Sequence, residues 1–423
     1  MITDLEETAF PALYAHFVGL FRGSKPWLKV VQKHQLQIKA NPYSQPQIQR
    51  ENRVAYGLAA FDDGGLEHAG SSDWPNIQHA MSFAAQVCQI VDQAPDEAGK
   101  QGYIGRIRGA FTNPAEMRAI RFEHLTALAL YRQGGQIEWP ETKNGPERFD
   151  ILVSDSEGGT VEVECKSCSP DKGREITERE ATQFFCHLLE RLEAVTKPGE
   201  VVMVKVRVPK RLPTSDKELA ILAGEVVQAI EAGASSTEQG VLLAFRRYNS
   251  PLVTIKDLPA EVVQCEVNAQ ASREFNGVEG YRVLKYSPST SVAFCVEVCS
   301  GRSPEFFDAT WATAKHAIQN QMTKTRPGCL VLRLEGMGKE ALEQFAQETP
   351  NTLAWFATKV LRDDRHQHLA CLAFVSDETV AVTSPDSKTP QSCSYVFDRK
   401  DGQHANIAIG RQLLGPYQEQ KTS

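Results

Sequence analysis

The sequence predicts an α/β protein in which helices flank a mixed central sheet, with a mainly helical region before this core and a second α/β region after it. Three observations lead to this fold class. Apolar residues recur at helical spacing in the first hundred residues, and short β-branched stretches alternate with helical patterns from residue 136 onwards. Between them, at residues 149–166, lies a hairpin whose second strand alternates strictly between apolar and polar residues.

Composition restricts the class of protein further. The chain has 423 residues, 41% hydrophobic and 23% charged, which is the balance of a globular protein with room for two or three domains. No apolar run approaches the ~18–20 residues of a membrane span, the first ten residues are acidic, and ten cysteines are scattered without a framework. We therefore expect a cytoplasmic protein without a membrane partner. The net charge of −7 disfavours a protein that binds nucleic acid through a basic charge over its whole surface, but a local basic groove is compatible with it.

Residues 1–100 form the predicted N-terminal helical region. Apolar residues repeat at helical spacing over residues 10–21 and 76–91, and turn residues fill residues 40–46 and 62–75. The four histidines of this region have no metal-ligand spacing, and we interpret them as core or solvated side chains: His16, His34, His68 and His79.

Residues 101–210 form the predicted core. Asn113 and Pro114 supply an N-cap and a first helical residue for a helix over residues 115–131. A short strand at residues 136–140 follows, and then come the hairpin, a helix over residues 176–195 and a strand over residues 201–208. This order predicts helices packed on a mixed sheet.

Residues 211–423 form the predicted C-terminal α/β region. Two interpretations of this region stay open: a degenerate repeat of the core, or a module that selects substrate or partner. Helices are expected over residues 219–231, 306–323, 341–347 and 353–360. Strands are expected over residues 241–245, 262–267, 281–286, 292–298, 329–334 and 369–375.

The polar face of the hairpin is suited to a hard cation. In its second strand, period-two alternation puts Glu162, Glu164 and Lys166 on one face, and Asp150 begins the first strand. Mg²⁺ prefers oxygen ligands, so Asp150 and Glu164 can meet at one ion, with Glu162 a step further out. The alternative is a surface strand with an exposed ion pair, which would contribute little. We favour the metal site because flanking helices should bury this face.

The motif also resembles a known signature. Asp150, thirteen intervening residues and then Glu164-Cys165-Lys166 resemble the D-x(n)-(D/E)-x-K pattern of the PD-(D/E)XK nuclease superfamily, although Phe149 replaces the proline. The elements of residues 123–208 follow that superfamily's order, in which Glu123 stands for the glutamate of the first helix.

This resemblance implies a restriction-endonuclease-like core and Mg²⁺ or Mn²⁺ as cofactor. It implies that Asp150, Glu164, Glu123 and the Cys165 carbonyl hold the metal, and that the catalytic set is Asp150, Glu164, Lys166 and Glu123. A bound divalent ion would polarise the phosphoryl oxygen. Lys166 would orient or deprotonate the attacking water, or hold the phosphate.

Four further residues are candidates for contact with nucleic acid. Gln183 and His187 are four residues apart on one helix face, which is similar to the Q-xxx-Y element of RecB-like exonucleases with histidine in place of tyrosine. Arg106 and Arg108 precede the helix of residues 115–131 and are candidates for phosphate contacts. In both cases a plain solvated flank is the alternative.

The function predicted from these observations is metal-dependent hydrolysis of phosphodiester bonds, in DNA rather than RNA. A nuclease with extra regions and no Walker A motif is typical of bacterial anti-phage defence. The alternative is a catalytically inactive nuclease-fold protein that acts as a nucleic-acid-binding or protein-interaction subunit. A homo-oligomer and a partner subunit are both compatible with the sequence.

Overall fold

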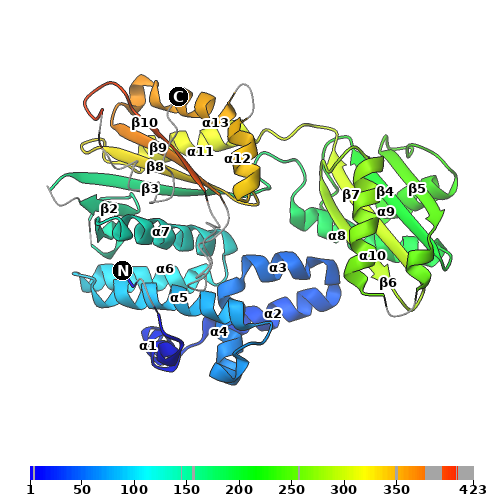
Figure 1. Cartoon of the computed structure of the whole chain (residues 1–423), viewed down its shortest axis with the longest axis horizontal. Coiled ribbons are helices and arrows are strands. Elements are labelled where there is room, and N and C mark those ends of the chain that lie inside the picture. Colours follow the sequence, from blue (N-terminus) through cyan, green and yellow to red (C-terminus); the bar gives the residue numbers. More distant parts are fainter. Residues whose placement is uncertain are drawn as a thin grey trace. The chain divides into compact units, whose positions relative to one another are not determined.

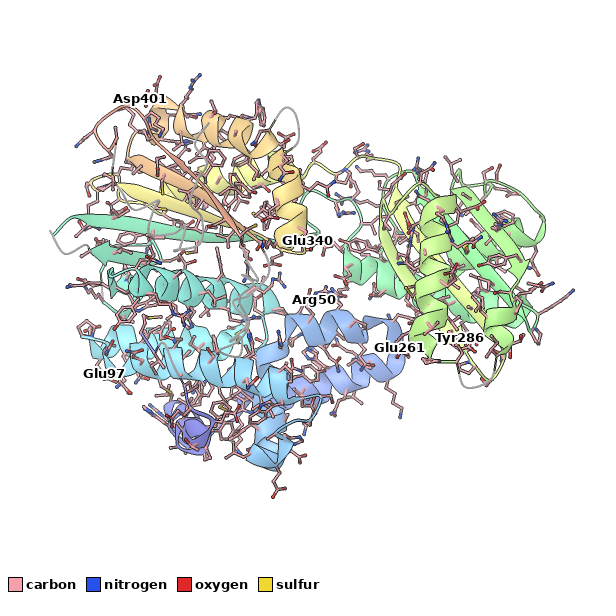
Figure 2. All side chains as sticks on the ribbon, in the orientation of Figure 1. Arg50, Glu97, Glu261, Tyr286, Glu340 and Asp401 are labelled. Carbon is pink, nitrogen blue, oxygen red and sulfur yellow. The ribbon has the colours of Figure 1, made fainter. Side chains whose placement is uncertain are left out.

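A computed structural model describes residues 1–2, 5–143, 145–154, 158–255, 258–347, 351–376, 393–405 and 407. It is mixed α/β, as predicted, and divides into two compact units. Unit 1 consists of Met1–Lys33, Glu51–Lys172 and Phe307–Ser423, and unit 2 of His34–Arg50 and Gly173–Phe306. Figure 1 labels their helices and strands, and Figure 2 adds the side chains. None of the described helices is both long enough and apolar enough to cross a membrane.

The first hundred residues are mainly helical, as predicted. The helices of this region and of the start of the core are α1 (Phe10–Leu20), α2 (Pro26–Ala40), α3 (Gln45–Glu51), α4 (Arg53–Gly64), α5 (Trp74–Asp92), α6 (Glu97–Ala110) and α7 (Pro114–Arg132). The N-cap at Asn113 is confirmed, because its side chain accepts a hydrogen bond from the Glu116 amide and Pro114 is the first helical residue.

The sheet of unit 1 contains the hairpin. Its strands are β1 (Gln136–Glu138), β2 (Ile151–Ser154), β3 (Thr160–Cys168), β8 (Gly328–Leu334), β9 (Leu369–Ser376) and β10 (Ser394–Asp398), in the order β1-β2-β3-β8-β9-β10. The pairs β3–β8 and β8–β9 are parallel and the others antiparallel. The sheet is therefore mixed, as predicted.

Helices cover both faces of this sheet. Helices α5 to α7 lie on one side, and α11 (Phe306–Asn320), α12 (Lys339–Gln347) and α13 (Thr352–Leu361) lie on the other (Figure 1). Val161, Val163 and Cys165 belong to the same hydrophobic core as Ile120 and Ala127 of α7. Strand alternation therefore directs Glu162 and Glu164 to the opposite face. Both faces of β3 are buried, so the expectation of a buried polar face is confirmed.

Unit 2 has its own sheet, in the order β5-β4-β7-β6. Its strands are β4 (Glu200–Val208), β5 (Leu242–Asn249), β6 (Tyr281–Ser287) and β7 (Val292–Ser300), and its longer helices are α8 (Glu178–Val195), α9 (Asp216–Glu231) and α10 (Ala260–Glu274). The strand predicted over residues 262–267 is wrong, because these residues lie in α10. Val263, Val267 and Ala271 are buried at four-residue spacing, and this period is helical.

The helix predicted over residues 176–195 and the strand predicted over residues 201–208 are present, but the strand does not belong to the sheet of the hairpin. They form α8 and β4, whose apolar residues share one hydrophobic core with α9 and β7 in unit 2. In unit 1 their places after β3 are taken by α11 and β8. The two units thus cut across the three regions predicted at 1–100, 101–210 and 211–423.

The two sheets are not simple repeats of each other. In both, the second strand of an antiparallel hairpin pairs with a parallel strand, β8 in unit 1 and β4 in unit 2. However, β8 follows its hairpin along the chain, whereas β4 precedes its hairpin. This difference in connectivity disfavours a plain tandem duplication.

Candidate functional site

Asp150 stands at the end of the β2–β3 ladder. The last pair of this ladder joins Ile151 to Val163, so the Cys165 amide lies beyond the end of β2. The Asp150 Oδ2 atom accepts a hydrogen bond of 2.7 Å from that amide. Asp150 therefore satisfies a backbone donor that the ladder leaves open, and its carboxylate is fixed beside β3.

Glu164 and Lys166 form the polar centre of β3. Glu164 is fully buried, and Lys166, whose side chain is 23% exposed, donates from its ammonium group to the Glu164 Oε1 atom. The second oxygen of Glu164, Oε2, is buried and makes no hydrogen bond with any described residue. A buried carboxylate oxygen without a partner is energetically unfavourable, so this atom is available to a further ligand.

Glu123 of α7 is buried and held by Arg106 of α6. The Arg106 Nη2 atom lies 2.7 Å from Glu123 Oε1, and its Nη1 atom lies 2.9 Å from Oε2. The same guanidinium also donates to Glu116 and Glu141, at 2.6 and 2.8 Å. Arg106 thus serves three carboxylates in this structure rather than facing solvent as a phosphate contact.

The carboxylates of the site oppose one another electrostatically. The pKa of Asp150 lies well above its usual value because burial and the charges of Glu123 and Glu164 outweigh Lys166 and the Cys165 amide. Burial raises the pKa of Glu164 to about 7 in spite of Lys166. Burial lowers the pKa of Lys166, but Glu164 and Asp150 outweigh this effect and the pKa rises. A cation placed here would relieve the repulsion among the carboxylates.

The side chains of the site have the oxygen atoms that a hard cation prefers, but they do not converge on a single point in this structure. Asp150 and the orphaned oxygen of Glu164 are the oxygen ligands that Mg²⁺ prefers. Burial raises the pKa of Cys165 well above its usual value, which leaves only its carbonyl as a ligand for a hard ion. Among the described residues, no three His, Cys, Asp or Glu side chains converge as a metal-binding group. One reason is that the ion pair with Arg106 keeps the Glu123 carboxylate from joining Asp150 and Glu164.

Glu162 has a structural role. It lies on the same face as Glu164 and is fully buried, but it accepts hydrogen bonds from the Thr323 amide at 2.8 Å and from Arg326 Nε at 2.9 Å. These contacts fasten the segment that leads from α11 to β8, which places β8 beside β3.

The structure does not bring the other predicted nucleic-acid contacts into this site. Gln183 is exposed and His187 lies 2.7 Å from Asp216, and all three belong to unit 2. Arg108 is exposed in unit 1, with its guanidinium 5.7 Å from the centre of the Phe21 ring.

Sequence reasoning missed the residues that β8 contributes. β8 pairs with β3 in parallel, and Arg333 lies opposite Ser167, the residue after Lys166. The strand itself was predicted, but nothing in the sequence links it to a hairpin so far away along the chain. One feature of the sequence could have indicated this contribution, because Arg333 is a charged residue within an otherwise apolar strand.

A buried histidine behind the site makes stability dependent on pH. His124 of α7 bonds the Tyr103 hydroxyl at 2.6 Å, and burial, followed by the charge of Arg106, lowers its pKa to about 3. The folded chain therefore keeps His124 neutral while the unfolded chain protonates it below about pH 6.5. Stability from this group is complete above that pH and is lost on acidification, by about 2 kcal/mol between pH 7 and pH 5.

Urea unfolding at pH 7 and pH 5 checks this expectation. The difference in unfolding free energy between wild type and His124→Gln should shrink by that amount at the lower pH. An unchanged difference would show that His124 is not held neutral.

Comparison of the chain with protein-family models, curated proteins and solved structures finds no match. The site is therefore interpreted from its own residues.

Proposed function

We propose that this chain is a metal-dependent nuclease that hydrolyses phosphodiester bonds, in DNA rather than RNA. The observation that carries the proposal is the buried Glu164 oxygen, which has no hydrogen-bond partner among the described residues and lies beside Asp150 and Lys166 on one hairpin. A buried carboxylate pair with an ammonium group needs a function, because an isolated pair of this kind gains little stability.

The topology of unit 1 supports the proposal. Apart from the segment of unit 2, helix α7, strands β1, β2 and β3, helix α11 and strand β8 follow one another along the chain in the order expected of a restriction-endonuclease-like core, and β1, β2, β3 and β8 are neighbours in the sheet. Most of unit 2, Gly173–Phe306, lies between β3 and α11 along the chain. We interpret that segment as an insertion into the core, with a role in choosing substrate or partner.

The residues would divide the chemistry between them. Asp150, Glu164 and the Cys165 carbonyl would hold Mg²⁺ or Mn²⁺, which when bound polarises a phosphoryl oxygen and lowers the pKa of water. Lys166, drawn to this point by Glu164, would bind the phosphate or orient the attacking water. Glu123 would add negative charge from α7, in an orientation fixed by Arg106. The Asp150 contact with the Cys165 amide would keep the backbone of the site in place.

One observation favours the second candidate function, an inactive nuclease-fold protein that binds nucleic acid or a partner protein. Arg106 occupies both oxygens of Glu123, so the first-helix carboxylate is not available without a rearrangement. Without Glu123, the carboxylate ligands of the site would be Asp150 and Glu164 alone, and catalysis would have to use a single metal ion.

The setting we propose is the bacterial cytoplasm, with a role in defence against phage. None of the ten cysteines, all of which lie in the described part of the chain, forms a disulfide, which agrees with a reducing compartment. We expect a homo-oligomer or a partner subunit, and unit 2 is the part that we assign to such contacts.

The decisive assay incubates the full chain with linear and circular DNA and with RNA, with Mg²⁺, Mn²⁺ or EDTA. We expect divalent-dependent loss of DNA that Asp150→Asn abolishes, and phage protection in cells that fails with the same variant. Binding of DNA without cleavage under any of these conditions would replace the proposal by the second candidate. Cleavage that persists in EDTA would remove the assigned site.

A further inference from the structure

Four arginines gather next to the hairpin in unit 1. Arg333 of β8 donates to the Ser167 hydroxyl at 3.1 Å and to the Arg118 carbonyl at 3.4 Å, and its guanidinium lies 4.9 Å from the centre of the Phe122 ring. The other members are Arg53 of α4 and Arg118 and Arg121 of α7. All four are buried or half-buried, which is unusual for cations packed together.

His79 of α5 lies within this group. Its pKa is well below the usual value because of burial and of the charges of Arg121, Arg53 and Arg333. Three arginines are therefore close enough to act on one imidazole. The His79 Nε2 atom is buried and has no hydrogen-bond partner in the described part of the chain. At neutral pH the ring is uncharged, so one of its nitrogens can donate to an anion.

Among the described residues, carboxylates pair with some members of this group but not with Arg53. Arg118 lies 3.1 Å from Glu335 and 3.7 Å from Glu51, and Arg333 lies 3.4 Å from Glu335. Arg53, by contrast, donates to neutral acceptors, the Asn76 side chain at 2.8 Å and the Pro75 carbonyl at 3.5 Å. Like charges in a half-buried setting repel, and an anionic ligand would relieve this repulsion.

We propose that Arg53, His79, Arg118, Arg121 and Arg333 form a phosphate-binding site. Arginine is suited to this ligand because its planar fork binds phosphate oxygens in pairs. Arg118 and Arg333, tied to Glu335, form the fixed wall of the site, and Arg53, Arg121 and His79 supply the contacts.

The site adjoins the hairpin through Arg333, which binds the residue that follows Lys166. On the proposed nuclease function, on which this role rests, it holds a phosphate of the substrate strand on the α7 side of β3, where Arg333 contacts Arg118 and the Phe122 ring. A free phosphate group, inorganic or on a nucleotide, has the same chemistry, and the experiment separates the two sources.

The experiment measures binding without cleavage. A fluorescent single-stranded oligonucleotide is titrated with the full chain in EDTA between 50 and 200 mM salt, and inorganic phosphate is tested separately by thermal shift. Arg53→Gln and Arg121→Gln should each weaken oligonucleotide binding about tenfold and reduce the salt slope by about 0.7. Arg121→Lys should lose less, and Arg22→Gln, an exposed arginine outside the cluster, should change nothing.

Each outcome decides between the sources or against the site. Weakened oligonucleotide binding in both variants supports the site and assigns it to the strand. Unchanged oligonucleotide binding, with loss of the phosphate-induced thermal shift, supports the site and assigns it to a free phosphate group. If neither quantity differs from wild type while the variants stay folded, the inference is wrong. Because no cleavage is measured, these results stand apart from the success or failure of the nuclease assay.

Discussion

Replacing Lys166 by alanine is expected to lower the rate of divalent-dependent DNA cleavage by about 10²–10⁴-fold. Its ammonium is the only cation bonded to the buried Glu164 among the described residues, and it is held at the polar centre of β3. Without it, the pKa of Glu164 should rise further, because Lys166 is the main group that lowers it. The carboxyl then takes up a proton instead of remaining as an unpaired charge, so the chain should stay folded.

A matched control comes from a lysine that makes the same kind of pair at the surface. Lys143 bonds Glu138, and both side chains are about half exposed. Lys143→Ala should leave cleavage and unfolding free energy nearly unchanged, because exposed pairs contribute little. Circular dichroism of both variants separates lost chemistry from lost structure. Full cleavage by folded Lys166→Ala would discard the mechanism assigned to the hairpin.

Replacing Glu164 by glutamine is expected to change how stability depends on pH in the metal-free chain. Burial raises the pKa of Glu164 to about 7, so the folded state holds a proton that the unfolded state releases near pH 4.5. Stability from this group is therefore present at low pH and is lost as the pH rises toward 7. Between pH 5 and pH 8, wild type should lose about 2–3 kcal/mol relative to Glu164→Gln. Chemical unfolding in EDTA at the two values measures this.

Glu162→Gln is the control for the neighbouring position. Glu162 is equally buried, but it accepts hydrogen bonds from the Thr323 amide and from Arg326. Its replacement should lower stability, because it removes a charged acceptor from these donors. If Glu162→Gln and Glu164→Gln behave alike, the two carboxylates have the same structural role and the special position of Glu164 is lost.

The parts of the site that could be predicted from the sequence are those fixed by local rules. Alternation along β3 placed Glu162 and Glu164 on one face, and the antiparallel register brought Asp150 next to Cys165. Cap and breaker residues also gave the start of α7 at Pro114. These features depend on residues close together in the chain, so a single sequence carries enough information.

The parts that could not be predicted depend on pairing over long distances. The sheet of unit 1 is completed by β8 and β9, which follow the long segment of unit 2, and local periodicity does not say which of several apolar strands will pair with β3. The role of Arg106 was missed for a related reason. Its partner Glu123 lies on the next helix, and only tertiary packing decides whether an arginine faces solvent or a buried carboxylate.

Calorimetric titration with Mn²⁺ tests the central claim, that the hairpin holds a divalent ion, most directly. Wild-type protein near pH 7.5 should bind one ion, and Glu164→Gln and Asp150→Asn should each abolish or severely weaken that binding while Glu162→Gln retains it. Absence of ion binding by the folded wild-type chain, or binding by Glu164→Gln and Asp150→Asn as strong as that of wild type, would contradict the account.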